Sequence, residues 1–174
     1  MTLYAHHPSP IGMLLLVGER GPDPAGDPAA ALELTGVYLP DHRRGRAVGA
    51  AWEEAPEAFV TVGAQLDAYF RGDRRTFDVP IRFVAGSPFQ RRVWDELRRI
   101  PAGETASYGD LAARCGVPGA ARAVGGAVAR NPISIIVPCH RVVGSDGAIT
   151  GYAGGIDRKR TLLALEAAAA PRRG

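Results

Sequence analysis

The sequence predicts an α+β fold in two parts, a small α+β domain with an antiparallel sheet over residues 1–85 and a mainly helical domain over residues 86–174. Two observations lead to this prediction: most short apolar runs of strand length lie in the first part, and capped helix starts follow one another in the second. The two parts also differ in the sign of their net charge, which bears on the partner rather than on the fold. The first part has 8 basic and 11 acidic residues and the second has 13 and 7.

The elements of the first part follow from their residue patterns. Residues 13–17 and 34–39 are predicted strands, and residues 76–83 alternate apolar and polar side chains as a half-buried strand does. Apolar residues recur at helical spacing from 58 to 70, which predicts a helix. The Pro/Gly/Asp-rich stretch from Gly21 to Pro28 is predicted to be a loop.

The second part is predicted to begin with a helix and a helix-turn-helix. Ser87-Pro88-Phe89-Gln90 has a capping serine, a proline at the first helical position and a glutamine at the capping-box position. Ser107 caps a second helix, and a short turn leads from it to a third over residues 120–130. Alanine and glycine line this third helix, and only Arg122 and Arg130 are long and polar. That composition favours minor-groove contact over major-groove reading, although a tightly packed internal helix would share it.

The most informative stretch runs from Ile135 to Val143. Its apolar residues predict a buried strand that ends at Pro138 and presents the thiol of Cys139. A thiol is a strong nucleophile only as the thiolate. His140 is placed to take its proton, through a turn or a bridging water, and Glu166, on the inner face of a last helix, to orient the histidine. The alternative is that the cysteine and the histidine are ordinary core residues.

The composition excludes several classes of protein. No apolar run approaches the roughly 20 residues of a membrane span, and no basic segment followed by an apolar one marks a secretory signal. Cys115 and Cys139 are too few for a disulfide framework, which favours the cytoplasm. The basic second part favours a polyanionic partner, although a GC-rich genome could also enrich arginine.

Pro138-Cys139-His140-Arg141-Val142 resembles the active-site motif of the O6-alkylguanine-DNA alkyltransferases, also called methylated-DNA–protein-cysteine methyltransferases. The likeness is close over residues 87–166 and loose before them. The other matching segments, in order, are 88–90, 107–108, 121–127, 131–132, 151–155 and 162–166.

The resemblance implies DNA repair by direct, irreversible transfer of the alkyl group from O6-alkylguanine in duplex DNA to Cys139. O4-alkylthymine is a further candidate substrate. The protein would act as a monomer, once per molecule and without a cofactor. Its helix-turn-helix would enter the minor groove, and the damaged base would be flipped out, since a buried thiol cannot reach it inside the duplex. His140 would be the base, acting through water, and Glu166 its orienter.

The resemblance also assigns roles to other residues. Asn131 would brace the turn between the recognition helix and the active-site segment, and Arg122 would fill the vacated base stack. Tyr108 would contact the phosphate of the flipped nucleotide and help to protonate the leaving guanine. Backbone groups near Val142 and the segment Tyr152-Ala153 would read the base. Further DNA-contact candidates on the recognition helix are Ala121, Ala123, Gly125 and Arg130.

The sequence departs from the family pattern at two points. Ala153 replaces a serine that many members carry, which removes a side-chain hydroxyl near the base. No cysteine precedes Cys115, so we expect neither the structural zinc of some relatives nor any other metal site.

Three other functions compete with alkyl transfer. A lesion-binding relative without enzymatic activity would have tryptophan in place of Cys139. A helix-turn-helix regulator would need a major-groove reader and usually a dimer interface. A cysteine hydrolase with a Cys-His-Glu triad would need a cleft for its substrate and deacylation by water.

Overall fold

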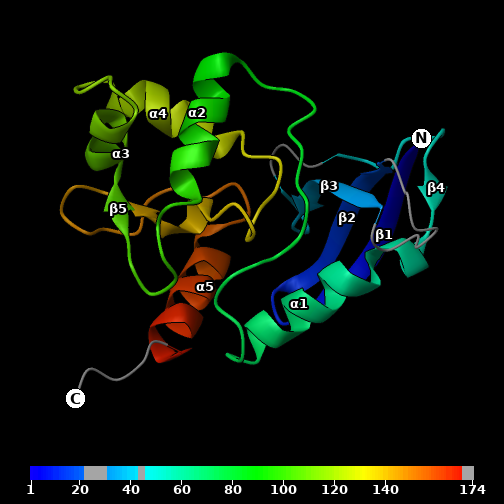
Figure 1. Cartoon of the computed structure of the whole chain (residues 1–174). Helices are drawn as coiled ribbons and strands as arrows, with labels where there is room; N and C mark the ends of the chain where they lie inside the picture. Colours follow the sequence, from blue (N-terminus) through cyan, green and yellow to red (C-terminus); the bar gives the residue numbers. More distant parts are fainter. Residues whose placement is uncertain (22–30, 43–45, 170–174) are drawn as a thin grey trace.

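In the computed structural model the described residues are 1–21, 31–42 and 46–169. The four-stranded sheet and α1 (Val60–Phe70) lie on one side of the molecule, and α2, α3 and α4 lie on the other (Figure 1). One hydrophobic cluster extends through both sides. The loop predicted from Gly21 to Pro28 lies almost wholly outside the described residues. The domain boundary near residue 85 stays a prediction.

The sheet has the order β3-β2-β1-β4. The first two strands form an antiparallel hairpin, β3 pairs antiparallel with β2, and the short β4 pairs parallel with β1. The α+β class, the antiparallel sheet and the strands around residues 13–17 and 34–39 are therefore confirmed. The first strand was not predicted from the sequence. The bounds are β1 (Thr2–Ser9), β2 (Gly12–Arg20), β3 (Leu32–Tyr38) and β4 (Glu53–Glu54).

The strand predicted over Thr76–Phe83 is wrong. Burial does alternate along this segment, but only Ile81 makes a β-bridge, to Leu34. The segment is the extended connector between the two sides of the molecule, and every second side chain packs against the core. The alternation of apolar and polar residues therefore reflects an extended chain that is buried on one side. It does not by itself indicate the ladder of backbone hydrogen bonds that defines a strand.

The helix predicted from 58 to 70 is present as a short 3-10 helix, η1 (Pro56–Phe59), followed by α1. The predicted helix starts in the second part are also confirmed. Ser87 and Gln90 form a capping box at the start of α2 (Pro88–Leu97). Ser107 and Asp110 form another at α3 (Tyr108–Arg114).

The third helix of the second part, α4 (Ala121–Ala129), packs against α2 and α3. The indole Nε1 of Trp94 in α2 donates a hydrogen bond of 2.8 Å to the carbonyl of Ala127. One face of α4 is thus buried, whereas Arg122 and Ala123 are exposed. One face of the second helix of the helix-turn-helix is therefore open to solvent.

The strand predicted before Pro138 is also wrong. Only Ile133 makes a β-bridge, to Val37. The chain then turns back, with the amide of Val137 donating to the carbonyl of Ile133 at 3.0 Å. Ile135 has φ of 71°, a left-handed value that is rare for a β-branched residue. Burial of the apolar run was predicted correctly, but a buried turn and a buried strand share that composition.

A 3-10 turn, η2 (Cys139–Arg141), follows directly. It leads into β6 (Val142–Val143), which pairs parallel with β5 (Ala106–Ser107). The described part of the chain ends in α5 (Ile156–Ala169), which is the predicted last helix that carries Glu166.

Candidate active site

Cys139 lies in the wall of a cavity of about 290 Å³ between α4, the start of α3 and the loop at residues 151–153. Its thiol is free, and the residue is 6% exposed. The cavity therefore gives a small group access to a thiol that is otherwise buried. The lining residues are His42, Tyr108, Gly125, Val128, Ala129, Asn131, Cys139, Gly151, Tyr152 and Ala153.

Asn131 braces the turn that precedes the cysteine. Its side-chain amide donates to the carbonyl of Val137 at 2.8 Å, and its side-chain oxygen accepts from the amide of Ile133 at 3.0 Å. Both ends of the buried turn are thereby held by one side chain. These bonds stabilise the left-handed conformation of Ile135 and fix the direction in which the chain enters η2.

Glu166, on α5, is 2% exposed and receives hydrogen bonds from three side chains. Its Oε1 lies 2.6 Å from Nε2 of His140 and 2.7 Å from the hydroxyl of Tyr69. Arg141 binds both carboxylate oxygens, through Nε at 2.9 Å and a terminal nitrogen at 2.8 Å. The inward position of Glu166 was predicted, whereas Arg141 and Tyr69 were not.

The partners of Glu166 fix the tautomer of His140. Hydrogen bonds and ionic contacts hold Glu166 ionised, so it only accepts, and Nε2 of His140 must carry the hydrogen. The other nitrogen, Nδ1, is then the basic one in the neutral ring. It is buried and has no hydrogen-bond partner within the described part of the chain. The geometry leaves one histidine nitrogen available to accept a proton in the interior.

The electrostatics favour neutral Cys139 and His140 at rest. Burial raises the pKa of the Cys139 thiol, and the nearby Asn131 side chain and Lys159 charge offset only part of this effect. Burial likewise lowers the pKa of His140, although Glu166 favours the charged ring. Proton transfer from the thiol to the histidine would therefore create a pair of charges that the surrounding groups must stabilise.

The net pKa shift of Glu166 is opposite to the shift that burial alone would cause. Burial alone would raise its pKa, but the hydrogen bonds from His140 and Arg141 outweigh this effect and hold the pKa well below its ordinary value. The carboxylate therefore keeps its negative charge beside the histidine, where it can stabilise an imidazolium.

These shifts predict that acid destabilises the fold. His140 and Glu166 both have depressed pKa values in the folded state, so the unfolded chain binds more protons as the pH falls. We expect the free energy of unfolding to fall below pH 6.5, and faster below pH 4.5, the ordinary values of the two groups. The slope should reach about 1.4 kcal/mol per pH unit for each group that titrates. Urea denaturation between pH 3 and 8 measures this, and His140→Asn should flatten the curve above pH 5. A flat wild-type curve would contradict the assignment.

Of the predicted DNA-contact residues, Tyr108 and Gly125 line the cavity. Arg122 and Ala123 are exposed on α4, Arg130 is exposed directly after it, and Ala121 is half-buried at its start. A side chain at Gly125 would lie 3.7 Å from the ring of Tyr108. The helix α4 thus contributes Gly125 to the cavity wall and has an exposed face with Arg122 and Ala123.

Of the three residues predicted to contact the base, Tyr152, Ala153 and Val142, only the first two lie at the cavity. Tyr152 and Ala153 line the cavity, and the buried hydroxyl of Tyr152 has no hydrogen-bond partner among the described residues. Val142 is fully buried and does not line the cavity; its carbonyl accepts from Lys159 at 2.5 Å. The structure therefore brings Tyr152 and Ala153, but not Val142, to the cavity that contains Cys139.

His42 and Lys159 belong to the site but were not predicted. His42 stands in a charged connector whose residues 43–45 lie outside the described chain. Lys159 shares a helical face with Leu162 and Glu166, so its spacing was a signal that it faces inward.

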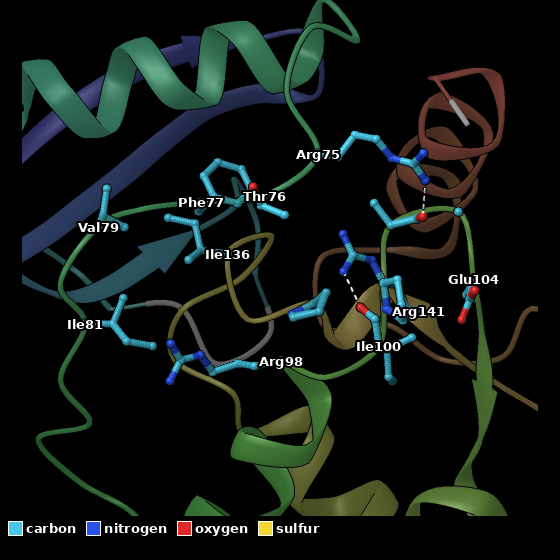
Figure 2. A pocket seen from close by; sticks show the side chains of 14 residues that line it. Arg75, Thr76, Phe77, Val79, Ile81, Arg98, Ile100, Glu104, Ile136 and Arg141 are labelled. Carbon is cyan, nitrogen blue, oxygen red and sulfur yellow. Dashed lines mark hydrogen bonds between the residues drawn. The ribbon is translucent and has the colours of Figure 1, made fainter. Parts of the chain in front are cut away.

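A second cavity, of about 880 Å³, lies beside η2 between the two sides of the molecule. Arg141 forms part of its wall, opposite the apolar side chains of Phe77 and Ile136 (Figure 2), and Pro138 also lines it. The Arg141 guanidinium also donates to the carbonyl of Ile100 at 2.5 Å. Arg141 thus ties η2 to the segment just after α2 as well as to Glu166.

Neither a metal site nor a membrane span is present in the part of the chain that the structure describes. No group of three or more His, Cys, Asp or Glu side chains is arranged to hold a metal ion there. No helix there is long and apolar enough to cross a membrane.

The chain is similar to known proteins over almost its whole length. A family model described as 6-O-methylguanine DNA methyltransferase, DNA binding domain, matches residues 88–168. A methylated-DNA–protein-cysteine methyltransferase of Mycolicibacterium paratuberculosis is 49% identical over 166 residues, which cover 95% of this chain and 93% of the relative. One of Methanosarcina acetivorans is 43% identical, with coverage of 94% and 97%. The crystal structure of Mycobacterium tuberculosis OGT in complex with DNA matches with a TM-score of 0.82 at 45% identity, covering 98% of this chain and 96% of that one.

Proposed function

This chain belongs to the family of methylated-DNA–protein-cysteine methyltransferases, and from that premise we propose that Cys139 is the cysteine that accepts the alkyl group. The protein is a DNA-repair enzyme that removes alkyl groups from DNA. The observation that carries the assignment is the position of the Cys139 thiol in the cavity wall. The only other cysteine, Cys115, is buried outside that cavity.

The proposed reaction starts with loss of the Cys139 proton to Nδ1 of His140, through one water. The thiolate attacks the alkyl carbon of O6-alkylguanine, a thioether forms, and the bond from that carbon to O6 breaks. The guanine takes up one proton as it leaves, with Tyr108 beside the cavity as the donor, so that a neutral base is released. The proton on the His140 imidazolium then replaces the Tyr108 proton through water, so that one proton passes from the thiol to the guanine overall. Glu166 stabilises the intermediate imidazolium. Because the thioether is stable, each molecule reacts once and needs no cofactor.

DNA binding is proposed to follow the geometry of α4. Its exposed face has small residues flanked by Arg122 and Arg130, which suits close approach to the minor groove with one arginine in the base stack. The damaged base would then enter the cavity, where Tyr152 and Ala153 form one wall. A monomer is sufficient, because the proposed acceptor, base and orienter come from one chain. The free thiols suit a reducing compartment such as the cytoplasm.

The test is the intact mass of the protein after incubation with duplex DNA that contains one O6-methylguanine. We expect a gain of one methylene, about 14 Da, capped at one per chain and mapped to the thiol of Cys139. Cys115→Ser is the matched control and should gain the same mass at the same rate. A gain at Cys115 would overturn the assignment. Lesion-selective binding without any gain would instead favour a damage-recognition protein that has lost the transfer chemistry.

A further inference from the structure

The loop at residues 150–154, called the base loop below, is held at both ends by neighbouring residues of α5. Lys159 Nζ donates to the carbonyl of Thr150 at 2.8 Å. Arg158 donates from a terminal nitrogen to the carbonyl of Gly154 at 3.0 Å. Between these anchors lie Gly151, Tyr152 and Ala153, which line the cavity. The first turn of α5 therefore determines where this wall of the cavity stands.

Arg158 also reaches two segments of the first part of the chain. Its Nε donates to the carbonyl of Ile11 at 2.8 Å, in the turn between β1 and β2. The same terminal nitrogen that binds the base loop lies 3.1 Å from the carbonyl of Pro40. Pro40 is two residues before His42, another residue of the cavity wall. One guanidinium thus joins the base loop to the hairpin turn and to the segment after β3.

Glycines allow this close packing. Gly154 is buried, and an added Cβ would lie 2.9 Å from Leu39 Cδ1 and 3.0 Å from a ring carbon of Tyr152. Gly12 has φ of 113°, and a Cβ there would lie 2.6 Å from Pro40 Cγ and 3.7 Å from the Arg158 guanidinium. The contact between the base loop and the first part of the chain is therefore closely packed around Arg158.

We propose that Arg158 is a positioning residue for base recognition, which fixes the base loop to the first part of the chain so that Tyr152 and Ala153 meet the flipped base correctly. This inference rests on the proposed function of the cavity. Donors and apolar contacts on a loop serve recognition only when the loop is held close to its working position, and a displacement of about 1 Å can reduce rates about 100-fold. A guanidinium can hold three carbonyls because its donors form a planar fork, whereas an ammonium is a single point.

The test compares Arg158→Ala and Arg158→Lys with Arg160→Ala. Arg160 is an exposed arginine on the same helix whose ion pair, with Asp157, is also exposed, so its removal controls for lost charge. Single-turnover transfer from O6-methylguanine duplex is measured over a range of protein concentrations. This separates the maximal rate from the half-saturating concentration. Alkylation of Cys139 by iodoacetamide, followed by mass mapping, reports the thiol without the need for a base. Thermal unfolding reports the fold.

We expect the maximal rate of Arg158→Ala to fall at least about tenfold, because the base is held less well. Half-saturation should change less than about threefold, since phosphate contacts dominate binding. Iodoacetamide reactivity should stay close to that of wild type. Arg158→Lys should recover part of the rate and is the decisive variant if Arg158→Ala unfolds at the assay temperature. Arg160→Ala should behave as wild type.

The inference is overturned if Arg158→Ala, or the lysine variant where alanine unfolds, transfers as fast as Arg160→Ala. Equal losses in the reactivity of Cys139 toward iodoacetamide and in alkyl transfer from the lesion would also overturn it, because the substitution would then act on the thiol or on the fold. Absence of transfer in the wild-type protein is a separate outcome, and it would contradict the proposed function and this inference with it.

Discussion

Replacement of Cys139 by serine is expected to abolish alkyl transfer and to leave binding of lesion-containing DNA almost unchanged. The thiol is the proposed nucleophile, and a serine hydroxyl in the same buried position cannot be ionised by one histidine. We expect a fall in the transfer rate of at least about 1000-fold, as for loss of a catalytic nucleophile. Binding should stay within about threefold of wild type, because contacts to phosphates supply most of the affinity.

Two measurements check this prediction. The intact mass after incubation with O6-methylguanine duplex should show no gain in Cys139→Ser, and fluorescence anisotropy should give the affinity for the same duplex. Cys115→Ser provides the comparison, since it removes the buried thiol outside the cavity. A mass gain on Cys139→Ser at another residue would show that the acceptor had been misassigned.

Replacement of Glu166 by glutamine is expected to reduce both transfer and stability. The amide cannot accept from Arg141 at both of its former oxygens, so a buried guanidinium loses its counter-charge. Removing one partner of a buried ion pair destabilises by about 3–5 kcal/mol. The imidazolium of His140 also loses its stabilising charge, and we expect the maximal transfer rate to fall about 100-fold or more.

Tyr69→Phe is the matched control for Glu166→Gln. It removes one neutral donor from the same carboxylate and leaves both His140 and Arg141 in place. The expected loss is about 1 kcal/mol of stability, the usual contribution of one hydrogen bond, with transfer much less affected. Urea denaturation and single-turnover rates measured below the melting temperature separate the two variants. Equal rates for the two would mean that the charge of Glu166 is not used in the reaction.

The predictions of the helices and of strands β2 and β3 depended on local signals, and these were sufficient. The serine caps at residues 87 and 107 fix helix starts by contacts within four residues. The two wrong strands failed for a common reason. Residues 76–83 and 135–137 have apolar patterns that report burial, but a strand also needs a neighbour to pair with, and that neighbour is a property of the whole fold.

The candidate site shows the same division between local and distant information. The motif around Cys139 and the inward position of Glu166 could be predicted from residue type and spacing. The bond from Tyr69 to Glu166 spans 97 positions, and that from Arg158 to Ile11 spans 147. No periodicity in the sequence relates such residues, so only the structure identifies these contacts.

The long separation of the groups around Glu166 has a consequence for biosynthesis. The ribosome makes Tyr69 first, His140 later and Glu166 in the last described helix, so the carboxylate joins its partners only when α5 has formed. Domains generally acquire structure as units during translation. A nascent chain in which α5 has not yet formed therefore lacks the carboxylate that orients the proposed base, His140. The proposed transfer chemistry is thus acquired only when this last described helix is in place.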